Sequence, residues 1–427
     1  MNCTQNEKLN QVSEQSIVVG VDIASETHYA RAFDWRGVEL GKVFKFENSM
    51  EGFRSFSKWV DILKKKTNKN AVLVGAEPTG HYWFGLASYL KAQEIKLVLV
   101  NPFHVKRSKE LDDNHPSKTD LKDPKTIAKL VIEGRYNEPY IPEGVYADLR
   151  IATACRLRII KELNGVKNRI QRWLKIYFPE YCKVYAKFEA VSSMIVLRSA
   201  PLPADIVALG VEGINKLWRD AKVRSVGMKR AKSLYEAAKS TIGCTNGSAA
   251  AKLEINLLIE DYRNKKNQYE SVMAVIEQLC MQIPEVEKLL AIKGVGIVTV
   301  AGFIAEVGDI RRFQSPKQIQ KLAGLALKEN SSGKCKGQTT ISKRGRSRLR
   351  AILFQAVMPL VSKNAEFAEI HRYYTTRAKK PLKKKQSLIA LSCKLIRVFY
   401  VILSKGITYD PVKLISDIQR PQEMLAA

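Results

Sequence analysis

The spacing of hydrophobic residues divides the chain into one region typical of strands and two regions typical of helices. Between residues 17 and 100, short apolar runs alternate with polar turns, and an amphipathic segment at residues 50–64 predicts a helix. The expected strands are residues 17–21, 29–33, 38–46, 72–75 and 97–100. The first three are close enough in the chain for an antiparallel meander, whereas the last two are typical of parallel strands buried on both faces. Residues 1–145 are therefore predicted to form an α/β domain with a mixed sheet.

Helical periodicity dominates the rest of the chain. An amphipathic helix is expected from residue 146 to residue 178, where Pro179 ends it. Residues 251–280 place Ile255, Tyr262, Tyr269 and Ile276 seven apart, which predicts either a short coiled coil or one amphipathic helix of an intramolecular bundle. We assign residues 146–282 to a helical linker and coiled-coil region, and residues 283–427 to a mainly helical C-terminal domain.

The composition indicates a nucleic-acid partner and argues against several other classes of protein. The 427 residues are 45% hydrophobic, enough for folded domains, and their net charge of +29 favours binding to a polyanion. No membrane insertion and no secretory signal are expected, because no long uncharged apolar run is present and the N-terminus lacks a basic segment followed by an apolar one. CxxC and HxxxH spacings, a phosphate-binding loop and a GxGxxG turn are also missing, which argues against structural zinc, ATP and dinucleotides.

Four acidic residues follow the pattern of a divalent-metal site. Asp22 ends the first expected strand, and Glu77 follows the expected strand at residues 72–75. Asp120 and Asp123 are three apart at the start of an expected helix, so they share one face, and Pro124 suits its first turn. Phosphodiester chemistry uses two Mg²⁺ ions, held by clustered carboxylates, to stabilise the attacking and leaving oxygens. Each residue alone has an ordinary alternative, as a solvated strand end or a helix cap.

The order of these carboxylates resembles the RuvC-like branch of the RNase H fold. Within that branch, GVDIASETHYA, EPTGHYW, LVNPFHVK and KTDLKDPKTIAKL are similar to the N-terminal DEDD domain of insertion-sequence transposases of the IS110 type. The resemblance implies that Asp22, Glu77, Asp120 and Asp123 are catalytic and bind Mg²⁺. One departure is Pro124, where the family commonly has a small residue.

The expected cofactor of this site is a pair of Mg²⁺ ions, and no other metal is implied by the resemblance. A first-turn proline leaves the carboxylates of the neighbouring residues free to act as ligands, so the departure at Pro124 does not change the expected ligand set.

A glycine-containing turn near residue 294 is the first candidate for DNA contact in the C-terminal region. The segment AIKGVGIVTVAGFIAEVG has the character of a helix-hairpin-helix, with Lys293, Gly294 and Gly296 in the turn and a helix over residues 298–305. Backbone N–H groups of such a turn can bind a DNA phosphate without reading its base. An ordinary turn between two packed helices also needs glycine, and the motif alone does not separate the two.

The segment LAGLALKENSSGKCKGQTTISKRGRSRLRAILFQAV resembles the C-terminal domain of the same transposases. Ser332, followed by Gly333, matches the nucleophilic serine of the family, and Ser331 is the adjacent alternative. Residues 311–350 hold 12 Lys or Arg and one acidic residue, and residues 377–385 form a second basic cluster. The basic residues nearest the serine are expected to bind phosphate and stabilise the transition state; they are Lys334, Lys336, Lys343, Arg344, Arg346 and Arg348.

The resemblance implies a function that composition does not reveal. In these transposases the DEDD domain and the serine form a composite site, with protomers contributing the halves in trans, and serine attack on DNA gives a phosphoserine link and a Holliday-junction-like intermediate. A structured guide RNA, DNA of the element ends and target, and a homo-oligomer (dimer or tetramer) are the implied partners, and the cytoplasm, at the nucleoid, is the expected location. A metal-dependent Holliday-junction endonuclease without serine chemistry and a non-catalytic nucleic-acid scaffold are the competing interpretations.

Overall fold

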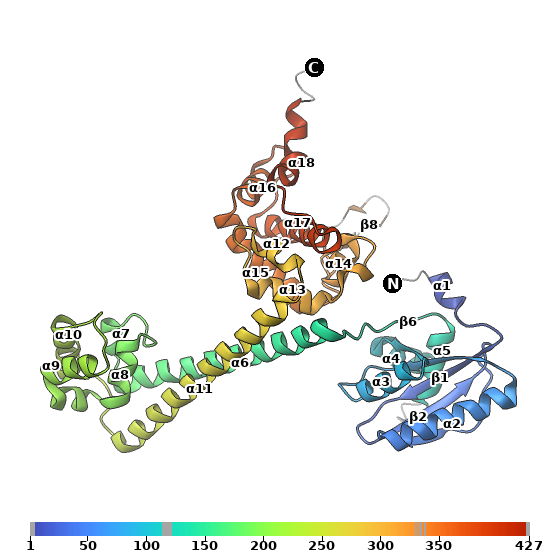
Figure 1. Ribbon diagram of the computed structural model, residues 1–427, viewed down its shortest axis with the longest axis horizontal. Helices are drawn as coiled ribbons and strands as arrows, with labels where there is room; N and C mark the ends of the chain where they lie inside the picture. The colour runs from blue at the N-terminus through green and yellow to red at the C-terminus, as the bar shows by residue number, and fades with distance from the viewer. Residues whose placement is uncertain (1–4, 113–121, 329–330, 333–334, 337–338, 424–427) are drawn as a thin grey trace. The chain divides into compact units, whose positions relative to one another are not determined.

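The computed structural model describes residues 5–112, 122–328, 331–332, 335–336 and 339–423 (Figure 1). The chain folds into two compact units, Met1–Ile141 and Pro142–Ala427. The N-terminal unit is an α/β domain with a mixed sheet, and the C-terminal unit is mostly helical, as the hydrophobic pattern predicts.

Six strands form the sheet of the N-terminal unit, in the order β3-β2-β1-β4-β5-β6. Their bounds are Ser16–Asp22 (β1), Thr27–Phe33 (β2), Phe44–Glu47 (β3), Ala71–Ala76 (β4), Lys96–Val100 (β5) and Tyr136–Asn137 (β6). The first three strands pair antiparallel, and β1, β4 and β5 are parallel to one another, which confirms both predictions. The predicted strand at 38–46 was too long, because Glu39 makes only an isolated bridge to Phe33 and regular pairing starts at Phe44.

Helices cover both faces of this sheet. The helices α2 (Met50–Thr67) and α3 (Trp83–Ala92) pack on the face that presents Val19 and Val74. The opposite face, which presents Val18 and Leu73, is covered by α4 (Pro102–Asp112) and α5 (Asp123–Ile132). A short helix, α1 (Gln5–Leu9), precedes the sheet. Because strand side chains alternate between faces, each strand contributes to both apolar layers.

Two long helices form the frame of the first part of the C-terminal unit. They are α6 (Gly144–Tyr177) and α11 (Ser248–Met281), and they pack against each other within one chain. Ion pairs join them between Lys265 and Glu162 (2.6 Å) and between Arg169 and Asp261 (3.9 Å). Packing on α6 accounts for the apolar repeat of α11, as expected for one amphipathic helix of an intramolecular bundle. Assembly of several chains through α11 stays a prediction.

A small helical cluster lies between α6 and α11 in the chain. It comprises α7 (Tyr181–Val184), α8 (Val191–Ser199), α9 (Pro203–Asp220) and α10 (Met228–Lys239). The indole N–H groups of the buried Trp173 and Trp218 donate to the carbonyl oxygens of Ala251 and Ser192, both at 2.9 Å. The first hydrogen bond joins α6 to α11 and the second joins α9 to α8, and both tryptophans lie in one core that the cluster shares with the long helices.

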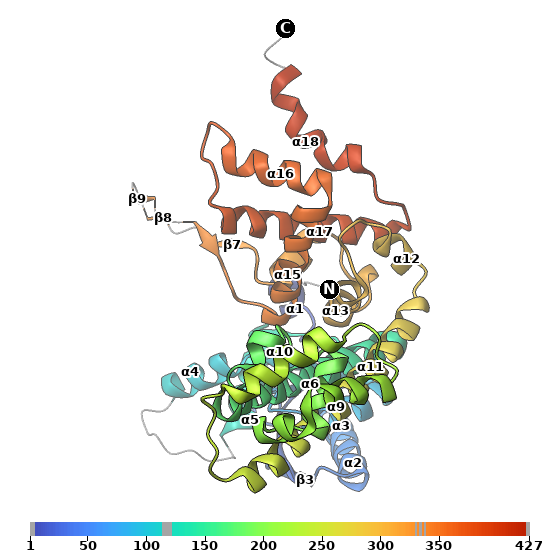
Figure 2. The same cartoon turned by 90° about the vertical axis from the view of Figure 1, so that its left-hand side faces the viewer.

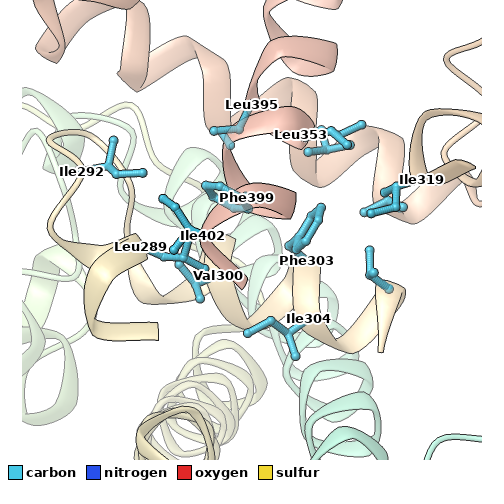
Figure 3. Close-up of a cluster of buried hydrophobic side chains, with 14 of the residues drawn as sticks. Leu289, Ile292, Val300, Phe303, Ile304, Ile319, Leu353, Leu395, Phe399 and Ile402 are labelled. Atoms are coloured by element: carbon cyan, nitrogen blue, oxygen red, sulfur yellow. The ribbon is translucent and has the colours of Figure 1, made fainter. Parts of the chain in front are cut away.

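The remaining helices of the C-terminal unit share a second core. Their bounds are Glu285–Leu290 (α12), Ile297–Val307 (α13), Pro316–Leu322 (α14), Ser347–Lys363 (α15), Ala365–Thr376 (α16), Lys384–Lys405 (α17) and Pro411–Glu423 (α18). Figure 3 shows Phe303 of α13 and Phe399 of α17 at its centre, with ring centroids 5.1 Å apart. The helix α17 is long and apolar enough to span a membrane, but Leu395, Phe399 and Ile402 bury its apolar face in this core.

Candidate active site and nucleic-acid interface

Asp22 and Glu77 stand at the carboxyl ends of two neighbouring parallel strands. The pairing of β1 with β4 aligns Val21 with Ala76, so the next residues along the strands are Asp22 and Glu77. Both residues are half-buried. Side chains alternate between the two faces of a strand, so Asp22 lies on the same face as Val18 and Gly20. By the same alternation, Glu77 lies on the face of Leu73 and Gly75. The sequence pattern therefore brings two carboxylates to one edge and one face of the sheet.

Two glycines let the helix α5 approach this face closely. Gly20 and Gly75 are partners in the register of β1 and β4. A Cβ at Gly20 would overlap the carbonyl oxygen of Pro124 and lie 2.8 Å from the amide nitrogen of Ala128, and a Cβ at Gly75 would overlap the side chain of Val131. The backbone of α5 thus lies directly against β1 at Gly20, and the side chains of Ile127 and Val131 pack into the space that Gly75 leaves on β4.

This contact positions Asp123, the first residue of α5. Pro124 occupies the first turn, as predicted, and its carbonyl oxygen lies over Gly20, two residues before Asp22. The Asp123 carboxylate forms an ion pair with Lys109 of α4. Asp120 lies outside the described residues, so its place on the same helix face stays a prediction. Three of the four predicted ligands therefore belong to one face at one edge of the sheet.

The donor set suits Mg²⁺, although the side chains are not gathered into a closed cage. Carboxylate oxygens are the ligands that Mg²⁺ prefers, and Mg²⁺ keeps several waters when one or two carboxylates hold it. Among the described residues, no three His, Cys, Asp or Glu side chains form a group that could hold a metal. The ion pair of Lys109 with Asp123 could not be predicted from the sequence, since residues on separate helices give no local signal of their pairing.

The two histidines near these motifs do not join the carboxylates. His28 is fully buried, with its ring 5.2 Å from Phe46 and 6.2 Å from Phe53. Burial lowers the pKa of the His28 imidazole in its aromatic surroundings. His81 lies in the exposed turn before α3 and contacts Tyr82.

Ser332 belongs to a narrow β-ribbon in the C-terminal unit. The inner pair of strands is β7 (Leu327–Lys328) with β10 (Thr340–Ile341), and the outer pair is β8 (Ser331–Ser332) with β9 (Cys335–Lys336). In the outer pair Ser332 is the partner of Cys335 and Ser331 of Lys336. Figure 2 shows β7, β8 and β9 projecting from the helices α15 and α17. Lys334 lies outside the described residues.

The base of this ribbon is fixed by backbone contacts. Ser342 and Arg346 donate their amide N–H groups to the carbonyl oxygens of Ala326 (2.8 Å) and Leu322 (2.7 Å). A Cβ at Gly345 would overlap the Leu322 carbonyl oxygen and lie 2.6 Å from the amide nitrogen of Gly324. The glycine of the basic stretch is therefore required for packing, and the ribbon leaves the helical core at a defined point.

The basic residues around the ribbon have different surroundings. Arg346 donates to the carbonyl oxygen of Glu306 at 2.8 Å, and Arg346 and Arg348 both pair with its buried carboxylate, at 3.4 and 3.5 Å. These two arginines stabilise the end of α13, so their ion pairs give them a structural role that needs no nucleic acid. Lys343 and Arg344, in contrast, are exposed. Phosphate binding by Lys336, Lys343, Arg344, Arg346 and Arg348 stays a prediction.

The glycine turn between α12 and α13 serves packing on one side and faces solvent on the other. Gly294 has φ +98°, and a Cβ there would lie 3.2 Å from the Cα of Leu360 in α15. Lys293 and Gly296 are exposed. This geometry suits an ordinary turn between two packed helices, and it also leaves the exposed side of the turn accessible to a DNA phosphate. It is therefore compatible with both interpretations, a packing turn and a phosphate-binding turn.

A second exposed basic segment connects α16 with α17. Arg377 stacks on Tyr374 at 5.8 Å, and five lysines beyond it are exposed; they are Lys379, Lys380, Lys383, Lys384 and Lys385. Pro381 breaks the helical path here, as predicted, because α16 ends at Thr376 and α17 begins at Lys384. Such a concentration of exposed like charge suits a polyanion backbone.

Replacing these five lysines with alanine is expected to flatten the salt dependence of DNA binding. Each phosphate contact contributes about 0.9 to the slope of log affinity against log salt, so the slope should fall by about 4.5 if all five lysines contact the DNA backbone. Fluorescence anisotropy with a labelled duplex across a salt series measures this slope. The matched control replaces Lys65 and Lys66, which are exposed at the end of α2. An unchanged slope in the five-lysine variant would remove this loop from the interface.

Burial disfavours nucleophilic chemistry at three of the described thiols, Cys182, Cys280 and Cys393. Burial raises the pKa of Cys182 and Cys393, and it raises the pKa of Cys280 to about 11. Since the thiolate is the nucleophilic form, these thiols are poor nucleophiles at neutral pH.

Comparison with known families and proteins matches both halves of the chain. Residues 19–179 match the DEDD transposase family of the IS110 type, described as "Transposase", and residues 286–373 match the "Transposase IS116/IS110/IS902 family". The first match contains Asp22, Glu77, Asp120 and Asp123, and the second contains Ser332. The two matches therefore include every residue that the sequence predicts to be catalytic.

Individual relatives are distant but align over much of the chain. The chain is 24% identical to the "Insertion element IS116 uncharacterized 44.8 kDa protein" of Streptomyces clavuligerus, over 69% of this chain and 73% of that protein. It is 22% identical to the "Pilin gene-inverting protein" of Moraxella bovis, over 92% of this chain and 97% of the relative. It is 27% identical to the "Transposase for insertion sequence element IS1111A" of Coxiella burnetii, over 26% and 30% respectively. By its two family domains and these relatives, the protein is a transposase of the IS110/IS116 family, an enzyme that recombines DNA.

Proposed function

We propose that this transposase cuts and rejoins DNA to mobilise its insertion sequence, with a Mg²⁺-binding carboxylate site and a serine nucleophile. The observation that carries the proposal is the position of Asp22, Glu77 and Asp123 on one face at the carboxyl edge of the sheet, against which Gly20 and Gly75 admit α5. Within this proposal the N-terminal unit is an RNase H-like domain of the RuvC type, and Asp120 completes the ligand set.

The carboxylates and Ser332 serve one strand-transfer reaction. Two Mg²⁺ ions held by the carboxylates would stabilise negative charge on the attacking and leaving oxygens. Asp123 would hold a Mg²⁺ ion in place of its ion pair with Lys109. The Ser332 hydroxyl loses its proton and attacks the phosphorus, the bond from phosphorus to one deoxyribose oxygen breaks, and that oxygen leaves as a hydroxyl after gaining a proton. A deoxyribose hydroxyl of the new partner strand then attacks the phosphoserine and releases the serine.

The net charge supports a large nucleic-acid load. A structured guide RNA that pairs with donor and target DNA would carry the sequence recognition, while exposed lysines and arginines bind backbone. The net charge of +29 and the basic segments at 311–350 and 377–385 fit this division of roles. We propose a dimer or tetramer as the active species, acting on DNA in the cytoplasm.

Covalent trapping tests the serine assignment. The full-length protein is incubated with its element-end DNA, the flanking non-coding RNA and Mg²⁺, and a denaturant-resistant protein–DNA adduct is sought. We expect the adduct in wild type and in Ser331→Ala, and its loss in Ser332→Ala. An adduct lost in Ser331→Ala alone would move the nucleophile by one residue.

The alternative function is that of a metal-dependent Holliday-junction endonuclease, and it is favoured by the carboxylate edge alone. It predicts Mg²⁺-dependent cleavage without an adduct, unchanged by either serine substitution. That outcome would remove the serine chemistry and retain the carboxylate site.

A further inference from the structure

The helix α4 displays an aromatic ring on the surface of the N-terminal unit. Phe103, in its first turn, is 61% exposed. The turn is fixed, because the side-chain oxygen of Asn101 accepts the Phe103 amide N–H at 3.0 Å and the Asn101 carbonyl accepts that of His104 at 2.8 Å. The exposed ring therefore belongs to an ordered turn that holds it at the surface.

A cationic side chain stacks on the Phe103 ring, and a buried residue anchors this part of α4 to the sheet. The Arg107 guanidinium, one helical turn further, lies 5.6 Å from the Phe103 ring centroid. Val105, between them, is 1% exposed and packs in the apolar layer that includes Ile127 of α5. The side chains of His104 and Lys106 are also exposed. An exposed ring among cations is the combination with which proteins bind unpaired nucleotides.

The ring lies at the same edge of the sheet as the candidate active site. The strand β5 is parallel to β4, and α4 begins directly after β5, at the edge of the sheet where Glu77 follows β4. Lys109, six residues after Phe103 in α4, pairs with Asp123. Six residues correspond to about 9 Å along a helix axis, which is about the length of two or three stacked bases.

We propose that Phe103 and Arg107 form a stacking platform for an unpaired base of the DNA strand that reaches the carboxylates. The face of a base is open for stacking on a side chain only where the base has left the duplex, and strand exchange creates such bases at the crossover. The ring supplies the stacking surface, and Arg107 and Lys106 neutralise the adjacent phosphates. The inference rests on the proposed function for the identity of the strand.

A second exposed pair of aromatic and cation provides a matched control. In the turn after β2, Trp35 is 39% exposed and the Arg36 guanidinium lies 5.9 Å from its ring. Because Phe33 pairs with Val18 near the start of β1, this turn lies at the opposite edge of the sheet from Asp22. Loss of the Trp35 ring should therefore leave binding at the platform unchanged.

The experiment compares single-stranded and duplex DNA in EDTA, where no cleavage occurs. Fluorescence anisotropy with one labelled oligodeoxynucleotide and its duplex is measured for wild type, Phe103→Ala, Phe103→Trp and Trp35→Ala. Phe103→Ala should weaken single-strand binding about tenfold and leave duplex binding within about twofold. Phe103→Trp should restore binding, and Trp35→Ala should behave as wild type. Equal losses for both DNA forms, or an equal loss in Trp35→Ala, would overturn the platform.

Photocrosslinking locates the contact directly. A 5-iodouracil base in the single strand should crosslink to the peptide that contains Phe103, and the crosslink should vanish in Phe103→Ala. Crosslinks confined to other peptides, or a preference of the platform for an RNA strand of the same sequence, would contradict the proposal. Neither readout needs Ser332 or Mg²⁺, so a failure of the proposed recombination chemistry would be seen separately in the trapping experiment.

Discussion

Replacing Gly20 with alanine is expected to loosen α5 from the sheet and destabilise the N-terminal unit by about 3 kcal/mol or more. The added Cβ would overlap the Pro124 carbonyl oxygen, and the Ala128 amide nitrogen would be 2.8 Å away. Both are backbone atoms within α5, so a change of rotamer cannot relieve the overlap and the helix must shift. Since α5 carries Asp123, the shift should also remove DNA cleavage.

Hydrogen–deuterium exchange of the full-length protein measures this effect locally. Peptides from β1 and α5 should exchange faster in Gly20→Ala, while peptides from α13 and α15 should not change. Gly165→Ala is the matched control, because Gly165 lies within α6 and a Cβ there meets no atom within 4 Å. That change should stabilise the protein by up to about 1 kcal/mol, as alanine is the better helix former. Unaltered exchange in Gly20→Ala would show that the close approach of α5 is not essential.

Replacing Asp22 with asparagine should reduce DNA cleavage by about 10²- to 10³-fold or more while leaving the fold intact. Asparagine has nearly the same shape, but it removes the negative charge that the edge of the sheet offers to a cation. The rate of cleavage of element-end DNA is measured across a Mg²⁺ series, and calorimetry measures Mg²⁺ binding by the protein alone. Both the rate and the affinity for Mg²⁺ should fall.

Glu26→Gln separates a specific ligand from general acidity at this edge. Glu26 is exposed, four residues beyond Asp22, and its change removes the same charge. We expect wild-type cleavage and Mg²⁺ binding in this variant. Equal losses in both variants would indicate a diffuse electrostatic effect, and full activity in Asp22→Asn would exclude the carboxylate site.

The local patterns of the sequence were sufficient to place most of the chemistry. Short apolar runs identified β1 and β4 and put Asp22 and Glu77 at their ends, and the pairing of the two strands places these ends side by side. Proline positions located the first turn of α5 and the break before α17. These features depend on residues close together in the chain, whose backbone preferences and burial are encoded locally.

Tertiary packing decided the contacts between distant segments. Gly20 and Gly75 could have served turns or bulges, and only the pairing of β1 with β4 makes them one contact surface for α5. The basic stretch predicts Arg346 as a phosphate ligand, but in the structure its guanidinium donates a hydrogen bond to the carbonyl oxygen of Glu306, 40 residues earlier. The apolar repeat of α11 fitted a second chain as well as α6, because periodicity defines which face is buried and does not identify its partner. The sequence by itself determined the elements, the carboxylate edge and the basic segments, whereas only the tertiary structure decided which charges are used inside the protein, since that choice depends on which distant residues come together.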